Sequence, residues 1–98
     1  MTRTSLLEDR LRQLAGELVK YRDQLAQLDD ELSRATDLAD DARLRASLAE
    51  TPAQDAAHQE ASHLELALSD AREALCQAIN GLERAREALL RRQAGDPT

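Results

Sequence analysis

The side chains best suited to chemistry in this chain are one cysteine, Cys76, and two histidines, His58 and His63. A zinc site needs several Cys or His side chains at short spacings, and the sequence has neither a Cys-x-x-Cys pair nor a His-Glu-x-x-His motif. The histidines are five residues apart, which places them on different faces of a helix. We expect two surface histidines and, because no activating base is evident, a half-buried thiol at Cys76.

The segment Glu60-Ala61-Ser62-His63 has the Glu-x-x-His spacing of carboxylate-bridged di-iron sites in helical bundles. Such sites also need inward-facing Glu side chains from other helices, and no inward-facing position predicted below carries a carboxylate. Gly16, Gly81 and Gly95 are isolated, so the chain has no Gly-rich loop for phosphate. We therefore predict a non-enzymatic protein with no metal site and no cofactor.

Apolar residues recur at alternating steps of four and three along most of the chain, which is the heptad pattern of a coiled coil. The first series contains Leu7, Leu11, Leu14, Leu18, Tyr21, Leu25, Leu28, Leu32, Ala35, Ala39, Ala42, Ala46 and Ala49. The second contains Ala57, Ala61, Leu64, Leu68, Ala71, Leu75, Ala78, Leu82, Ala85 and Leu89. The two series are out of phase by one residue, and Pro52 lies between them. The pattern predicts an all-α chain with an interruption near Pro52.

Capping signals define the expected helix ends. The segment from Ser5 to Glu8 has the pattern of a capping box. Thr51 is the expected N-cap of the second helix, and Pro52, which follows it, is the expected first helical residue. Gly95 suits a C-terminal cap. We predict a single domain, residues 1–98, with a helix over about 5–50, a turn near 51–52, a helix over about 52–94 and a frayed tail at 95–98. A further break within 36–41 is left open.

A very short connection favours antiparallel neighbours, so we predict a coiled-coil-type antiparallel two-helix hairpin. In the register that places the fold-back at the Thr51–Pro52 bond, Leu28 faces Leu75 and most other layers pair a large residue with a small one. The predicted core between the helices is Leu14, Leu18, Tyr21, Leu25, Leu28, Leu32, Leu64, Leu68, Leu75, Leu82 and Leu89. Near the turn the layers become Ala-on-Ala and should bury little area. One kinked helix in a parallel dimer is the competing interpretation.

Two helices alone leave an apolar flank uncovered, and stable domains bury such a flank. The second helix carries small residues at seven-residue steps: Ala67, Ala74, Gly81 and Ala88. A mid-helix Gly costs about 1 kcal/mol relative to Ala, so Gly81 suggests close approach by another helix. We predict that this stripe, with Ile79 and Leu90, forms the contact of a homodimeric four-helix bundle or with a helical protein partner. A solvated Ala-rich face is the plainer alternative.

Composition and charge exclude several classes. With one aromatic residue, Tyr21, and a net charge of −6, the chain is a poor nucleic-acid binder. No apolar run is long enough for a membrane span, the flanking faces are acidic, and a lone Cys favours a reducing, cytoplasmic setting. Residues 28–75 hold 12 acidic residues and four Arg, net −8, and the remainder is net +2. This acidic region could steer a basic partner, or it could simply be a solvated surface with pairs such as Asp41–Arg45.

Two resemblances bear on function. In size and two-helix form the chain resembles the small secreted hairpins of the WXG100 class, whose turn carries Trp-x-Gly where this chain has Glu50-Thr51-Pro52-Ala53. Glu65-x3-Ser69-x2-Arg72 is similar to the start of the polar ladder of actinobacterial anti-sigma factors that bind cyclic di-GMP. That ladder continues with Gln and Asp, where this chain has Cys76 and Asn80. Neither resemblance assigns the chain to a family.

These observations order the functional hypotheses. The first is a non-enzymatic protein–protein interaction module, a small self-associating hairpin acting as a bacterial adaptor, chaperone or regulatory subunit. The second, implied by the polar ladder, is a regulator that binds a nucleotide second messenger between helices through Arg72, Ser69 and Glu65. A bundle enzyme or metal store is the third, and a small secreted hairpin of WXG100-like shape is a further alternative. Which partner or pathway is involved does not follow from the residues.

Overall fold

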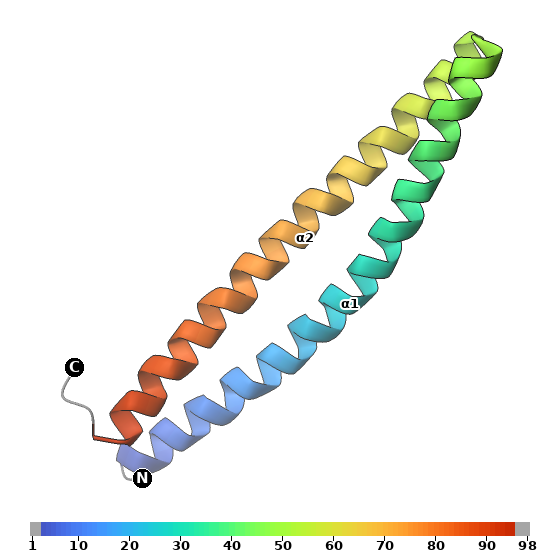
Figure 1. Cartoon of the computed structure of the whole chain (residues 1–98). Helices are drawn as coiled ribbons and strands as arrows, with labels where there is room; N and C mark the ends of the chain where they lie inside the picture. Colours follow the sequence, from blue (N-terminus) through green and yellow to red (C-terminus); the bar gives the residue numbers. More distant parts are fainter. Residues whose placement is uncertain (1–2, 96–98) are drawn as a thin grey trace. The chain divides into compact units, whose positions relative to one another are not determined.

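A computed structural model describes residues 3–95 of the chain, and side chains from residue 5 onward. Over that range it is all-helical, with no strand. Helix α1 (Arg3–Ala49) and helix α2 (Pro52–Gln93) are joined by Glu50 and Thr51 alone, as Figure 1 shows. The chain is thus a helical hairpin. Of the predicted tail, only Gly95 lies within the described residues, because residues 96–98 are outside them.

The connection between the helices is closed by local backbone chemistry. The Glu50 N–H still donates to the Ala46 carbonyl, at 3.0 Å, but Glu50 itself has a left-handed φ of 49° and ends α1. The Thr51 hydroxyl oxygen accepts a hydrogen bond from the Gln54 N–H at 3.2 Å, so Thr51 caps α2. Pro52 then starts the helix, where its missing N–H leaves no bond unmade. Two residues are therefore enough to connect the helices.

The outer ends of the helices differ from one another. α1 begins at Arg3, so Ser5 lies inside the helix and is not its N-cap, which corrects the capping-box assignment. Helix starts inferred from sequence shift by a residue or two because several polar residues in a row can serve as caps. α1 also runs without a break through 36–41. After α2, Gly95 takes a φ of 81°, and its N–H donates to the Arg92 carbonyl at 3.1 Å.

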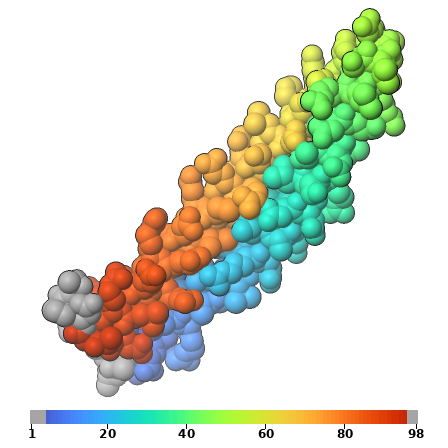
Figure 2. All heavy atoms as spheres, viewed as in Figure 1, coloured from blue at the N-terminus to red at the C-terminus, as the bar shows by residue number. Residues whose placement is uncertain are grey.

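The chain forms two compact units. The termini unit combines the described parts of Met1–Leu25 and Leu75–Thr98, and the turn unit is Ala26–Ala74. In each unit side chains of α1 and α2 are in contact (Figure 2). An ion pair links the helices in each: Arg22 Nη2 lies 3.4 Å from Glu83 Oε1, and Arg72 pairs with Asp29. A single kinked helix is excluded, because Asp29 and Arg72 are in contact although 43 residues separate them.

The two units have cores of different composition. In the termini unit Leu14 and Leu18 are 0% and 1% exposed and Ile79 is buried with them. In the turn unit the buried residues are alanines: Ala35, Ala39 and Ala46. Apolar burial contributes roughly 25 cal/mol per Å², and an Ala methyl offers little area. The turn unit is therefore held by less hydrophobic burial than the termini unit.

The first prediction concerns the buried leucines. Leu18→Ala should lower the free energy of unfolding by about 2–5 kcal/mol, because it removes a fully buried side chain and leaves a cavity. The control is Leu44→Ala, the same substitution at an exposed position of α1, which should change it by less than about 0.5 kcal/mol. Urea denaturation followed by circular dichroism measures both. Equal effects of the two variants would contradict the burial pattern.

A second prediction concerns the left-handed residue at the turn. Glu50→Gly should raise the free energy of unfolding by about 0.5–1 kcal/mol, because Gly adopts φ near 49° without the steric cost that a Cβ brings. The matched control is Glu31→Gly, in the middle of α1, which should lower it by about 1 kcal/mol. Thermal unfolding of the two variants separates them by the sign of the shift in Tm.

Candidate interaction site

Exposure along α2 shows which of its faces α1 covers. Buried or half-buried positions follow steps of four and three: Gln54, His58, Ala61, Glu65, Leu68, Arg72, Leu75, Ile79 and Leu82, with Leu89 near the end. Every second residue of the predicted α2 seam faces α1 as expected, namely Ala61, Leu68, Leu75, Leu82 and Leu89. The positions between them are displaced by one residue, so that His58, Glu65, Arg72 and Ile79 take the places expected for Ala57, Leu64, Ala71 and Ala78. The α1 seam has no such displacement.

Two predicted site residues change roles as a result. Leu64, expected in the core, is 50% exposed, and Ile79, expected at the outer contact, is 6% exposed. The reason in the termini unit is side-chain size, because burying the branched Ile79 removes more apolar area from water than burying Ala78. The other predicted core residues, Tyr21, Leu25, Leu28, Leu32, Leu68, Leu75, Leu82 and Leu89, are half-buried, beside the buried Leu14 and Leu18.

Arg72 explains how the turn unit accepts a polar residue at a seam position. Its side chain is half-exposed and its guanidinium pairs with Asp29 of α1. The aliphatic stem of an arginine can cover apolar surface while the charged head remains hydrated. Exposed pairs of this kind are worth about 0.2–1 kcal/mol, so the contact adds register more than stability.

The displacement leaves a face of mostly small residues on α2, each of them exposed or half-buried. In the turn unit Ala57, Leu64, Ala67, Ala71 and Ala74 are all exposed. In the termini unit Ala78 and Ala88 are exposed, and Gly81 and Ala85 are half-buried. We call these nine residues the small-residue face. It contains the four predicted stripe positions, four of the five Ala positions of the predicted α2 seam, and Leu64.

Leu90 does not belong to this face. It is 42% exposed, but it follows Ala88 by two residues, and residues two apart point to opposite sides of a helix. Its place in an outer contact stays a prediction, whereas Ile79 is buried and is not available on the outer surface of the hairpin. The stripe residues Ala67, Ala74, Gly81 and Ala88 do share one side of α2.

Gly81 has no explanation within its own chain. A Cβ placed on it would meet no atom within 4 Å. Gly in a helix interior is less favourable than Ala by about 1 kcal/mol, and nothing nearby in this chain requires the smaller residue. Gly16 on α1 is equally open, but its neighbours do not form a face of small residues.

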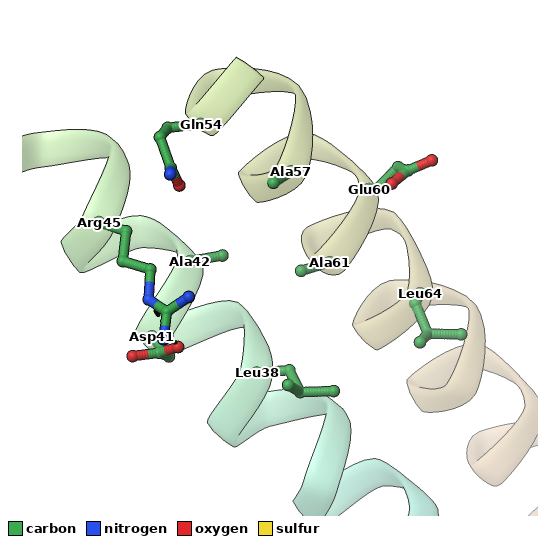
Figure 3. A pocket seen from close by; sticks show the side chains of 9 residues that line it. All are labelled: Leu38, Asp41, Ala42, Arg45, Gln54, Ala57, Glu60, Ala61 and Leu64. Carbon is green, nitrogen blue, oxygen red and sulfur yellow. Dashed lines mark ion pairs between the residues drawn. The ribbon is translucent and has the colours of Figure 1, made fainter. Parts of the chain in front are cut away.

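The turn unit contains an apolar groove of about 540 Å³. Its floor and walls are Leu38 and Ala42 of α1 with Ala57, Ala61 and Leu64 of α2, and its rim carries Asp41, Arg45, Gln54 and Glu60. In Figure 3 Ala42 and Ala61 point toward one another across the groove, and the Glu60 carboxylate is directed away from its floor. The groove exists because these layers pair alanine with alanine, which leaves space between the helices unfilled.

Charge separates the two units. The turn unit holds 12 acidic residues and four Arg, net −8, whereas residues 1–25 and 75–98 hold seven acidic and nine basic residues, net +2. Asp41 and Arg45 on the groove rim form the expected ion pair, at 3.2 Å. Among the described residues Glu60 makes no ion pair, so the rim presents an uncompensated carboxylate beside apolar surface.

The residues expected to bind a nucleotide lie near a second cavity of the turn unit, of about 450 Å³. It is lined by Leu32, Thr36, Ser62, Glu65, Leu66 and Ser69. Arg72, the one cation of the predicted ladder, is paired with Asp29. A free carboxylate in the cavity and a neutralised guanidinium beside it disfavour a phosphate group. The arrangement therefore offers little attraction to an anionic ligand.

Other chemistry is sparse in the described part of the chain. No group of three or more His, Cys, Asp and Glu side chains is placed to hold a metal ion there. Cys76 is half-buried. Neither α1 nor α2, as far as they are described, is long and apolar enough to cross a bilayer. Comparisons with protein-family models, curated proteins and solved structures found no match to this chain.

A third prediction tests the observed α2 register. Ile79→Ala should lower the free energy of unfolding by about 2–4 kcal/mol, whereas Leu64→Ala should lower it by less than about 1 kcal/mol. The seam read from the sequence predicts the opposite order, with Leu64 in the core and Ile79 outside it. Denaturant unfolding of both variants at one protein concentration decides between the registers.

Proposed function

We propose that this chain is a non-enzymatic protein–protein interaction module that associates with a second copy of itself through the small-residue face of α2. In this proposal α1 and α2 pack antiparallel along the hairpin, and two hairpins form a homodimeric four-helix bundle. Such bundles are built from helix pairs with short connections, and two-fold dimers are the commonest closed assembly.

The observation that carries the proposal is Gly81 within an otherwise Ala-rich exposed face. Small side chains allow two helix backbones to approach closely and to gain van der Waals contact along their length. Each unit contributes part of the face: Ala57, Leu64, Ala67, Ala71 and Ala74 in the turn unit, and Ala78, Gly81, Ala85 and Ala88 in the termini unit. An exposed apolar face of this length marks a contact with another protein more often than a solvated surface.

The charges of α2 favour a second copy as the partner, in antiparallel orientation. Residues 52–74 of α2 carry five acidic residues and one Arg, net −4, and residues 75–93 carry two acidic residues and four Arg, net +2. An antiparallel pair of α2 helices places each acidic half beside a basic half. A parallel pair would place like charges together, which weakens association.

A self-associating hairpin of this kind suits the roles of adaptor, assembly chaperone or regulatory subunit, all of which act by presenting a helical surface. A nucleotide-regulated hairpin would need a free cation for phosphate, whereas the guanidinium of Arg72 is paired with Asp29.

The test is the mass of the protein in solution. Multi-angle light scattering should give twice the chain mass of 10.9 kDa for the wild type. Gly81→Leu and Ala74→Leu should each shift it toward the monomer, because the larger side chain prevents close approach of the helix backbones.

The matched control is Ala26→Leu, which places the same side chain on an exposed position of α1 and should leave the dimer intact. Circular dichroism checks that all three variants remain helical. If the wild type is a monomer, or if the α2 variants keep the dimer mass, the small-residue face is not a self-association surface.

A further inference from the structure

The apolar groove of the turn unit lies beside the small-residue face and shares Ala57 and Leu64 with it. A groove of about 540 Å³ accommodates several small side chains of one helical turn. Its walls are apolar, whereas its rim and the unit around it are acidic. An occupant should therefore be a helix with small apolar residues on one side and arginines next to them.

The end of α2 in the termini unit has this chemistry. Ala85 and Ala88 lie on the small-residue face, and Arg84 and Arg91 lie on either side of Ala88, one turn away in each direction. Neither arginine forms an ion pair within the described residues. The four arginines of this stretch give it a positive charge that matches the net −8 of the turn unit.

We propose that the groove of each copy receives the Ala85–Ala88 turn of a second copy, with Glu60 on the rim pairing with Arg84 or Arg91 of that copy. This inference rests on the proposed antiparallel self-association and adds the register of the two α2 helices and the site that is occupied. Glu60 continues the seven-residue repeat of Ala67, Ala74, Gly81 and Ala88. If two α2 helices run antiparallel with Ala74 near the two-fold axis, Ala67 meets Gly81 and Glu60 meets Ala88.

In this register each position of the repeat has a compatible partner. Gly81 faces Ala67, so the backbones come closest next to the axis, where a side chain at position 81 would obstruct them. Glu60 faces Ala88 and reaches the arginines beside it. The contact occurs twice in a two-fold dimer. A charge change therefore contributes twice to the free energy of dissociation.

Charge reversal tests the pairing. Glu60→Arg alone, and Arg84→Glu with Arg91→Glu, should each weaken dimerisation by about tenfold or more in analytical ultracentrifugation, because like charges then meet at both contacts. The triple variant that carries all three changes should recover the wild-type dissociation constant to within a few-fold. Glu73→Arg is the control, since it makes the same charge change at an exposed α2 position outside the face and should have little effect.

Disulfide trapping tests the orientation in a Cys76→Ser background. Ala74→Cys should form a covalent dimer on mild oxidation, because two copies meet near the axis. Ala67→Cys alone should not, whereas a mixture of Ala67→Cys and Gly81→Cys chains should form a mixed disulfide. Circular dichroism confirms helical content for every variant before oxidation.

The outcomes separate the two proposals. A monomeric wild type overturns the self-association itself. A dimeric wild type that is indifferent to Glu60→Arg, or that is trapped by Ala67→Cys alone, retains the proposed function and overturns the occupancy of the groove. Both proposals are supported if dimerisation is weakened by Glu60→Arg and by the Arg84→Glu, Arg91→Glu variant and is recovered in the triple variant.

Discussion

The fold depends on one contact, the apolar seam between α1 and α2. Within residues 3–95, α1 and α2 have only each other to pack against, and the single aromatic side chain of the sequence, Tyr21, is half-buried. Hydrophobic stabilisation must then come from leucines and alanines arranged along two faces. Where both sides of the seam offer leucine or isoleucine, as in the termini unit, side chains become fully buried. Where they offer alanine, as in the turn unit, a groove remains.

The same constraint explains why apolar residues stay exposed on α2. A two-helix layer covers one side of each helix, and the side next to it stays exposed unless another protein covers it. On α1 the positions beside the seam are mostly charged. On one flank of the α2 seam they are Ala, Leu and Gly over a length of several heptads. These exposed apolar residues of α2 add no stability to the isolated hairpin, and the proposed association would bury them.

The charged residues around this apolar surface are unevenly distributed. The ion pairs between the helices are exposed and contribute little energy, but opposite net charges distinguish the turn unit from the termini unit. Small apolar contacts do not by themselves discriminate between parallel and antiparallel partners. Unequal charge along α2 does so, because one orientation brings opposite charges together and the other opposes them.

The sequence alone determined the all-helical class, a turn near residues 51–52 and the α1 seam; the structure places the connection at Glu50 and Thr51. These features depend on local rules: the seven-residue repeat of leucines, a capping threonine, and a proline that cannot continue the preceding helix. The absence of zinc and phosphate-loop motifs was also readable from residue types and spacing. The groove could have been anticipated from the Ala-on-Ala layers near the turn.

Only the tertiary structure decided which side of α2 faces α1. Counting apolar positions treats alanine and leucine alike, so Ala57, Leu64, Ala71 and Ala78 formed a better pattern than His58, Glu65, Arg72 and Ile79. In the folded chain the register depends on the size of Ile79 and on the pairing of Arg72 with Asp29, both of which require the opposite helix to be in place. Relative to the predicted seam, every second α2 position that faces α1 is displaced by one residue. Leu64 is therefore exposed and Ile79 is buried. This displacement also widened the predicted stripe into a face, because the size of a side chain affects packing only once a second surface meets it.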